Sequence, residues 1–152
     1  MTTVQILLTL HILSALVGVG ATVSYFFWLR RAVSVPESRA FTLETIRLLE
    51  RWLVTPAYII VFLSGLGLID RASWAWSTPW LELSILLLIV LMGLVGVHAR
   101  VIKRQLALAT DGSDNSAEYD SAHSRGRILL IAKAVVITAL VYLMVFKPPL
   151  WG

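Results

Sequence analysis

Residues 81–97 read LELSILLLIVLMGLVGV, and this run decides the fold because it is long enough to cross a lipid bilayer. A helix of roughly 20 apolar residues spans the hydrocarbon layer of a membrane, which is about 30 Å thick. Three further runs of this kind occupy residues 4–29, 53–69 and 128–146. In lipid the backbone must satisfy its own hydrogen bonds, and the runs lack the polar alternation of a barrel strand. We therefore expect four membrane-spanning helices.

The composition agrees with a membrane protein and excludes several chemistries. Of the 152 residues 58% are hydrophobic and only 14% are charged, whereas a soluble domain carries more charge. The absence of cysteine excludes disulfides, thiolate catalysis, iron–sulfur clusters and covalently attached c-type haem. We predict an all-α polytopic membrane protein, a four-helix up-down bundle that forms a single transmembrane domain over residues 1–152. Its helices are expected at about 4–30, 53–70, 80–101 and 127–147.

The charges predict an orientation rather than a nucleic-acid partner. The net charge is +4, but most of the basic residues lie in the connections between the apolar runs. Only Arg71 lies between the second and third runs and only Lys147 follows the fourth, whereas ten basic residues lie in the other two connections: Arg30, Arg31, Arg39, Arg47, Arg51, Arg100, Lys103, Arg104, Arg125 and Arg127. By the positive-inside rule we expect these two connections in the cytoplasm and both termini on the periplasmic side of a bacterial inner membrane.

Tryptophans mark the expected helix ends, as interfacial aromatic belts do. Trp28 and Trp52 fall at the cytoplasmic ends of the first two helices, and the remaining four fall on the outer side: Trp74, Trp76, Trp80 and Trp151.

Residues 38–52 combine apolar side chains at helical spacing with basic ones. We expect an amphipathic helix that lies at the headgroups and runs into the second membrane helix. That second helix is expected to open near Thr55 and Pro56, because proline is tolerated in a first turn. The basic loops favour anionic lipid headgroups as partners beside the bilayer itself. Docking onto another protein is the alternative for this segment.

Small and polar residues recur at spacings of three and four along the first helix, which places them on one face: His11, Ser14, Ala15, Gly18, Thr22 and Tyr25. Such a face packs against other helices in lipid. It serves contacts within one chain, in a homo-oligomer or with a membrane-complex partner equally well. His11 is thus predicted to point into the bundle, where it can ligate a haem iron, shuttle protons or bond a Ser or Thr on a neighbouring helix.

His98 and Lys133 are weaker candidates for cofactor binding. His98 lies close to the basic run at residues 100–104 and is expected at headgroup level. Lys133 lies at a similar depth, where it can snorkel to the headgroups or join His98 and loop arginines in a pocket for an anion. His11 and His98 are not expected to clamp one haem, because the helical rise separates them by roughly 16 Å along the membrane normal.

Several short motifs resemble one family along nearly the whole chain: LHILSA at residues 10–15, WLVTPA at 52–57, PWL at 79–81 and LMVFKP at 143–148. They are similar to a family of small bacterial integral membrane proteins catalogued as domain of unknown function 2269. The resemblance implies a four-helix membrane protein with no established activity. It does not support His98, because many relatives have a tryptophan-proline stretch where this chain reads GVHAR at 96–100. More distantly, the Leu-His pair at His11 resembles HemJ-type protoporphyrinogen oxidases and CopD-type copper proteins.

Three functional hypotheses follow for this small membrane protein of unknown activity. The leading one is an accessory or redox-associated protein that binds b-type haem through His11. The second is a HemJ-like membrane oxidase of a tetrapyrrole, which needs further polar groups around His11. The third is a small transporter or channel subunit. It needs paired charges within the membrane or broken helices, and the apolar runs give no sign of either.

Overall fold

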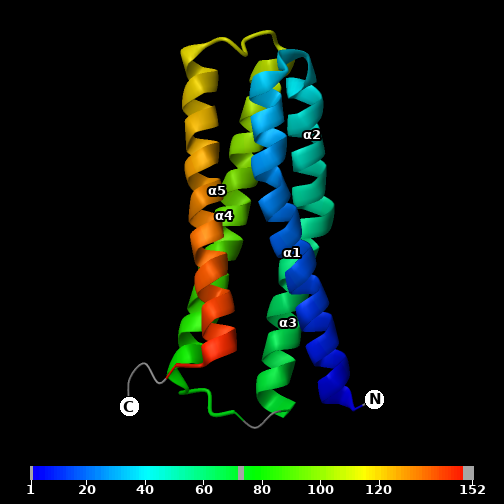
Figure 1. The fold of residues 1–152 in the computed structure, drawn as a ribbon, viewed down its shortest axis with the longest axis vertical. Coiled ribbons are helices and arrows are strands. Elements are labelled where there is room, and N and C mark those ends of the chain that lie inside the picture. Colours follow the sequence, from blue (N-terminus) through cyan, green and yellow to red (C-terminus); the bar gives the residue numbers. More distant parts are fainter. Residues whose placement is uncertain (1, 72–73, 149–152) are drawn as a thin grey trace.

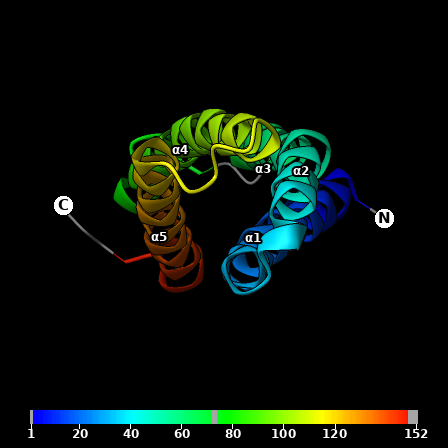
Figure 2. The same ribbon diagram turned by 90° about the horizontal axis from the view of Figure 1, so that it is seen from above.

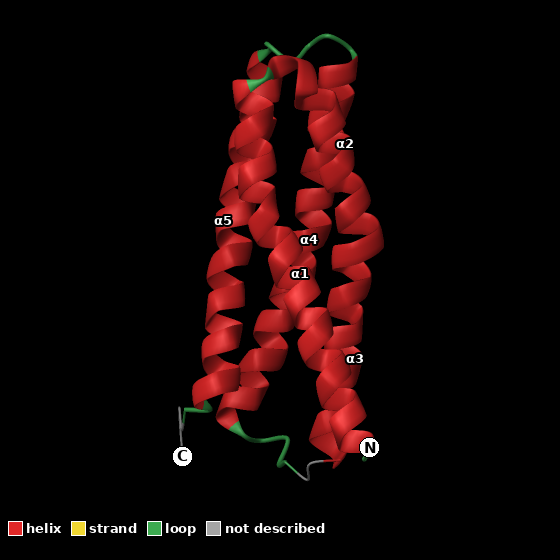
Figure 3. Cartoon of the chain, turned by 45° about the vertical axis from the view of Figure 1, so that its right-hand side comes forward, coloured by secondary structure: helices red, strands yellow, loops and turns green. Residues whose placement is uncertain are grey.

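The computed structural model describes residues 2–71 and 74–148, in which helices and loops account for the whole fold (Figures 1 and 3). The helices are α1 (Thr3–Ser34), α2 (Arg39–Leu49), α3 (Thr55–Arg71), α4 (Pro79–Thr110) and α5 (Ala117–Phe146). A short 3₁₀ turn, Pro36–Ser38, joins α1 to α2, and a π-helical segment, Glu50–Val54, joins α2 to α3. The all-α prediction is confirmed. Four helical stretches are long and apolar enough to cross a membrane.

The helices extend further toward the basic end of the molecule than the apolar runs do. α1 begins at a capping box formed by Thr2 and Gln5 and continues for 32 residues, to Ser34. At 1.5 Å per residue it is about 48 Å long, against about 30 Å for the hydrocarbon of a bilayer. α4 likewise continues to Thr110 rather than ending near residue 101. The bundle therefore includes a helical extension beyond the apolar runs.

The expectation for residues 38–52 needs correction. α2 does not lie across the end of the bundle; it runs along the bundle and continues through the π segment into α3 (Figure 1). Its apolar face buries Thr42, Leu43 and Ile46 against the bundle. Pro56 consequently lies inside a continuous helix instead of opening one. Proline has no N–H for the carbonyl four residues earlier and crowds it, and the wider π turn just before Pro56 accommodates both effects.

The bundle consists of two helix pairs joined by α2. α1 packs chiefly against α3, and α4 packs along α5, whereas α1 with α5 and α3 with α4 make few contacts. α2 contacts both α1 and α4 and so bridges the pairs at the basic end (Figure 2). At the opposite end the pairs lie further apart (Figure 1). The main buried core accordingly surrounds the junction of α2 with the other helices, and includes Leu43, Ile46, Leu91, Ile102 and Leu130.

Ion pairs fasten the loops at the basic end. Arg39 Nη1 lies 2.6 Å from Asp114 Oδ2, and its guanidinium carbon lies 5.1 Å from the centre of the Tyr119 ring. Arg104 pairs with Glu118. The connection between α4 and α5 is thereby held against the start of α2.

The tryptophans divide between exposed and packed positions. Trp52 and Trp76 are exposed, as interfacial residues are. Trp80 is instead buried and packs edge-on against Trp74, with 5.2 Å between the ring centroids. Trp151 lies outside the described residues.

Candidate functional site

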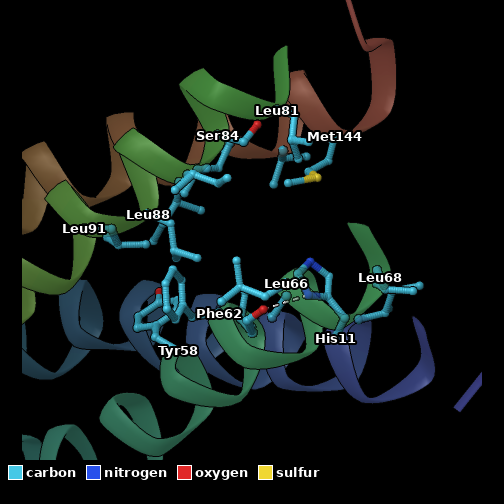
Figure 4. Close-up of a pocket in the computed structure, with 18 of the residues that line it drawn as sticks. His11, Tyr58, Phe62, Leu66, Leu68, Leu81, Ser84, Leu88, Leu91 and Met144 are labelled. Carbon is cyan, nitrogen blue, oxygen red and sulfur yellow. Dashed lines mark hydrogen bonds between the residues drawn. The ribbon is translucent and has the colours of Figure 1, made fainter. Parts of the chain in front are cut away.

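His11 lies on the inner face of α1, as predicted, and contacts α3. Its Nδ1 lies 2.9 Å from the carbonyl oxygen of Val61 and 3.1 Å from Ser64 Oγ. A carbonyl oxygen only accepts, so Nδ1 carries the proton and donates it. Nε2 is then the unprotonated nitrogen of the neutral ring, and it points into a cavity (Figure 4).

This cavity, which we call the His11 cavity, has a volume of about 430 Å³ and lies between the two helix pairs. Its wall is almost entirely apolar. α1 and α3 supply His11 and Phe62, and α4 and α5 supply Leu88 and Met144 from the opposite side (Figure 4). Hydroxyl groups in the wall belong to Tyr58 and Ser84. Ser84 Oγ donates to the Trp80 carbonyl at 2.6 Å.

Glycines let α1 and α3 approach closely enough to build this wall. A Cβ at Gly65 would lie 3.2 Å from His11 Cε1, so the imidazole ring rests directly on the α3 backbone. A Cβ at Gly18 would lie 2.8 Å from Tyr58 Cε1, closer than real contacts allow. A side chain at Gly18 would thus force the Tyr58 ring to shift, and one at Gly65 would press on the His11 ring.

A second polar site is fully buried nearer the basic end. Glu50 from the π segment, His98 from α4 and Lys133 from α5 meet there, and their side chains are at most 1% exposed. Lys133 Nζ donates to Glu50 Oε1 at 2.8 Å. His98 Nδ1 lies 2.8 Å from Glu50 Oε2 and 3.0 Å from Lys133 Nζ. We call these three residues the ion cluster.

Tyr25 completes the surroundings of the ion cluster. Its ring stacks on the His98 ring with 6.2 Å between centroids, and Lys133 Nζ lies 5.4 Å from the Tyr25 ring centroid. Tyr25 Oη and His98 Nε2 are both buried and make no hydrogen bond within residues 2–71 and 74–148. Burying a polar atom without a partner costs about 1–3 kcal/mol, so two such atoms on two stacked rings are unusual.

The structure corrects the predictions for His98 and Lys133. His98 does not face the headgroups, and Lys133 does not snorkel; both side chains are enclosed by protein. The two residues do share a pocket, as the anion-site hypothesis requires, but the anion is the carboxylate of Glu50 and no loop arginine takes part. His98 and Lys133 do not line the His11 cavity.

Glu50 is the residue that sequence reasoning missed, because it was assigned to the polar face of a surface helix. The sequence does contain a signal that points to Glu50, namely the need of Lys133 for a counter-charge. A lysine within an apolar helix needs a counter-charge at the same depth. Glu50 precedes the second apolar run by three residues at the basic end, whereas Asp70 and Glu82 lie at the opposite end. Among the acidic residues, Glu50 is therefore the one nearest to an apolar run at the end where Lys133 lies.

The site geometry also provides features that the transporter hypothesis requires. Buried paired charges are present, and the helix that carries Glu50 departs from regular α geometry at that residue. The oxidase hypothesis gains no comparable support, because the wall around His11 offers few polar groups.

Comparison with known proteins agrees with the membrane architecture and assigns no activity. No curated protein and no solved structure matches the chain. The model of one family, described as a predicted integral membrane protein of the domain of unknown function 2269, matches residues 5–148. Because the match extends over nearly the full length, the chain belongs to this family of integral membrane proteins.

Proposed function

We propose that this protein is an accessory membrane protein that binds b-type haem in the His11 cavity, with His11 Nε2 as the iron ligand. One observation carries the proposal: the second ring nitrogen donates to the Val61 carbonyl at 2.9 Å. Metal-ligating histidines usually donate their other N–H in this way, which fixes the ring orientation and raises the basicity of the ligating nitrogen.

The residues around His11 fit a haem. A flat, largely apolar macrocycle needs an apolar cleft of several hundred Å³, and the cavity is of that kind. Met144 lies in the opposite wall (Figure 4), and a methionine thioether is a known ligand of haem iron. Lys147 Nζ lies 4.7 Å from the ring centroid of Trp74, which lines the cavity, so Lys147 would offer a cation beside the cavity for a propionate. A bound haem would supply one-electron chemistry.

The test is the absorption spectrum of protein expressed with haem supply and purified in detergent. We expect a Soret band in the wild-type protein and its loss or marked shift in His11→Ala. His123→Ala is the matched control, because His123 lies in the helical extension near Tyr119, away from the cavity. A wild-type protein without a Soret band, or a band that His11→Ala leaves unchanged, would refute haem binding through His11.

Two other functions remain as alternatives. A HemJ-like oxidase of a tetrapyrrole would use the same cavity, and complementation of a strain that lacks this oxidase would reveal it. A transporter or channel subunit is favoured by the buried Glu50–Lys133 pair and by the π segment beside it.

We further propose that the protein lies in the bacterial inner membrane with both termini on the periplasmic side. The basic ends of α1, α2, α4 and α5 would then face anionic headgroups of the cytoplasmic leaflet. Outward apolar side chains such as Leu13 and Phe27 fit acyl chains, a second copy of the chain or a membrane-complex partner.

A further inference from the structure

The ion cluster contains a mismatch that points to a mobile proton. His98 Nδ1 lies within hydrogen-bond distance of a carboxylate oxygen of Glu50, at 2.8 Å, and of the Lys133 amine, at 3.0 Å. A ring nitrogen either carries a proton and donates or has a lone pair and accepts. It cannot donate to Glu50 and accept from an ammonium group at the same time.

Two protonation states related by one proton transfer each satisfy part of this geometry. In the first, Lys133 is an ammonium that donates to Glu50 Oε1 and to His98 Nδ1, and the lone pair of Nδ1 faces the carboxylate unfavourably. In the second, one proton has moved from Lys133 Nζ to His98 Nδ1. The imidazolium now donates to Glu50 Oε2, while the neutral amine still donates to Oε1. The two states have the same net charge and differ by one proton transferred across 3.0 Å. The static alternative is a neutral His98 ring whose Nδ1 donates to Glu50 beside a Lys133 ammonium group.

The surroundings suit a charge that moves between Lys133 and His98. The π face of Tyr25 lies against both groups, and a ring face stabilises a nearby cation. From α3, Tyr58 is the titratable neighbour, and its hydroxyl lies 3.4 Å from Thr22 Oγ1. α2 buries only Thr42, Leu43 and Ile46 here, none of which titrates. Glu50, His98 and Lys133 are therefore the ionisable groups other than tyrosine that meet in this core.

The second ring nitrogen of His98 has no partner with which to exchange a proton. Its Nε2 is buried without a hydrogen-bond partner among the described residues, as is Tyr25 Oη. Proton exchange of His98 within this core therefore runs through Nδ1, toward Lys133. Ionisable residues of this kind inside a membrane protein are functional candidates.

We propose that Glu50, His98 and Lys133 form a proton-sharing site, in which one proton moves between Lys133 Nζ and His98 Nδ1. Glu50 is the fixed anion that pairs with the cation in either state. The π segment presents its carboxylate, and π segments occur frequently at functional sites. The site needs no haem and shares no residue with the His11 cavity, so it stands or fails independently of the proposed function.

The test is nitrogen NMR of the full-length protein, with ¹⁵N-labelled histidine, in lipid nanodiscs. His11→Asn and His123→Asn assign the His98 signals by elimination. We expect the His98 Nδ1 signal to be averaged between the protonated and unprotonated forms of that nitrogen, while the Nε2 signal stays that of a protonated nitrogen. In Glu50→Gln the averaging should disappear, because no carboxylate then stabilises the imidazolium. Glu44→Gln, an exposed carboxylate on α2, should leave the signals unchanged.

A purely structural ion pair would behave differently. His98 Nδ1 would then be either fully protonated or fully unprotonated in the wild-type protein, and that result would overturn the shared proton. The wild-type measurement decides the question even if Glu50→Gln fails to fold.

Discussion

At Gly18, one missing methyl group sets the separation of α1 from α3. A Cβ there would lie 2.8 Å from Tyr58 Cε1 and 3.0 Å from Cζ, so the ring would have to move. Tyr58 lines the His11 cavity, and its hydroxyl contacts Thr22 on α1. Because Gly18 and Thr22 contact the ring from the same face of α1, a shift at Gly18 would reach the cavity and the pairing of the two helices.

We therefore expect Gly18→Ala to destabilise the bundle by about 1–3 kcal/mol, the usual cost of overpacking. Gly20→Ala is the matched control, because no atom lies within 4 Å of a Cβ built at that position. Thermal unfolding in detergent micelles, followed by circular dichroism, measures the difference. If Gly18→Ala unfolded at the same temperature as Gly20→Ala, the close contact with Tyr58 would be of no energetic consequence.

At the scale of the element, the π segment decides where Glu50 points. Its Glu50 carbonyl accepts from the Thr55 N–H, five residues on, and from Thr55 Oγ1 at 2.7 Å. Thr55 thus supports the widened turn with both its backbone and its side chain. Pro56 follows directly and cannot restore the regular α-helical hydrogen bond.

We expect Thr55→Val to lower stability by about 0.5–1.5 kcal/mol, the net value of one hydrogen bond, because the hydroxyl donor is lost while the side-chain shape is retained. Thr45→Val provides the comparison. It removes a similar bond, from Thr45 Oγ1 to the Phe41 carbonyl at 2.9 Å, but on an exposed face of α2 where water replaces it. Equal unfolding temperatures for the two variants would contradict a supporting role for Thr55 in the π segment.

At the scale of the whole molecule, hydrophobic length was sufficient to predict four helices, and helical spacing was sufficient to turn His11 inward. Neither signal reports how distant segments meet. His98 and Lys133 lie 48 and 83 residues from Glu50, and their contacts depend on α2 standing along the bundle. The amphipathic pattern of residues 38–52 fits a membrane surface and a protein surface equally well, so the sequence could not choose between them.

The basic end of the whole bundle is expected to face the cytoplasm, and the absence of cysteine makes this directly testable. Asn115→Cys places a single thiol in the exposed connection between α4 and α5, and Ser77→Cys places one in the connection between α3 and α4. In intact spheroplasts a membrane-impermeant maleimide should label Ser77→Cys and leave Asn115→Cys unlabelled until the cells are lysed. The reverse pattern would place both termini in the cytoplasm.

The length of the helices has a practical consequence for structure determination. α4 and α5 continue beyond their apolar runs as unbroken helices, and only a few residues separate Thr110 from Ala117. A helical fusion partner spliced across this connection would extend both helices without a flexible linker. A protein of 16.9 kDa that is otherwise too small for single-particle cryo-electron microscopy would thereby gain a rigid marker outside the detergent belt.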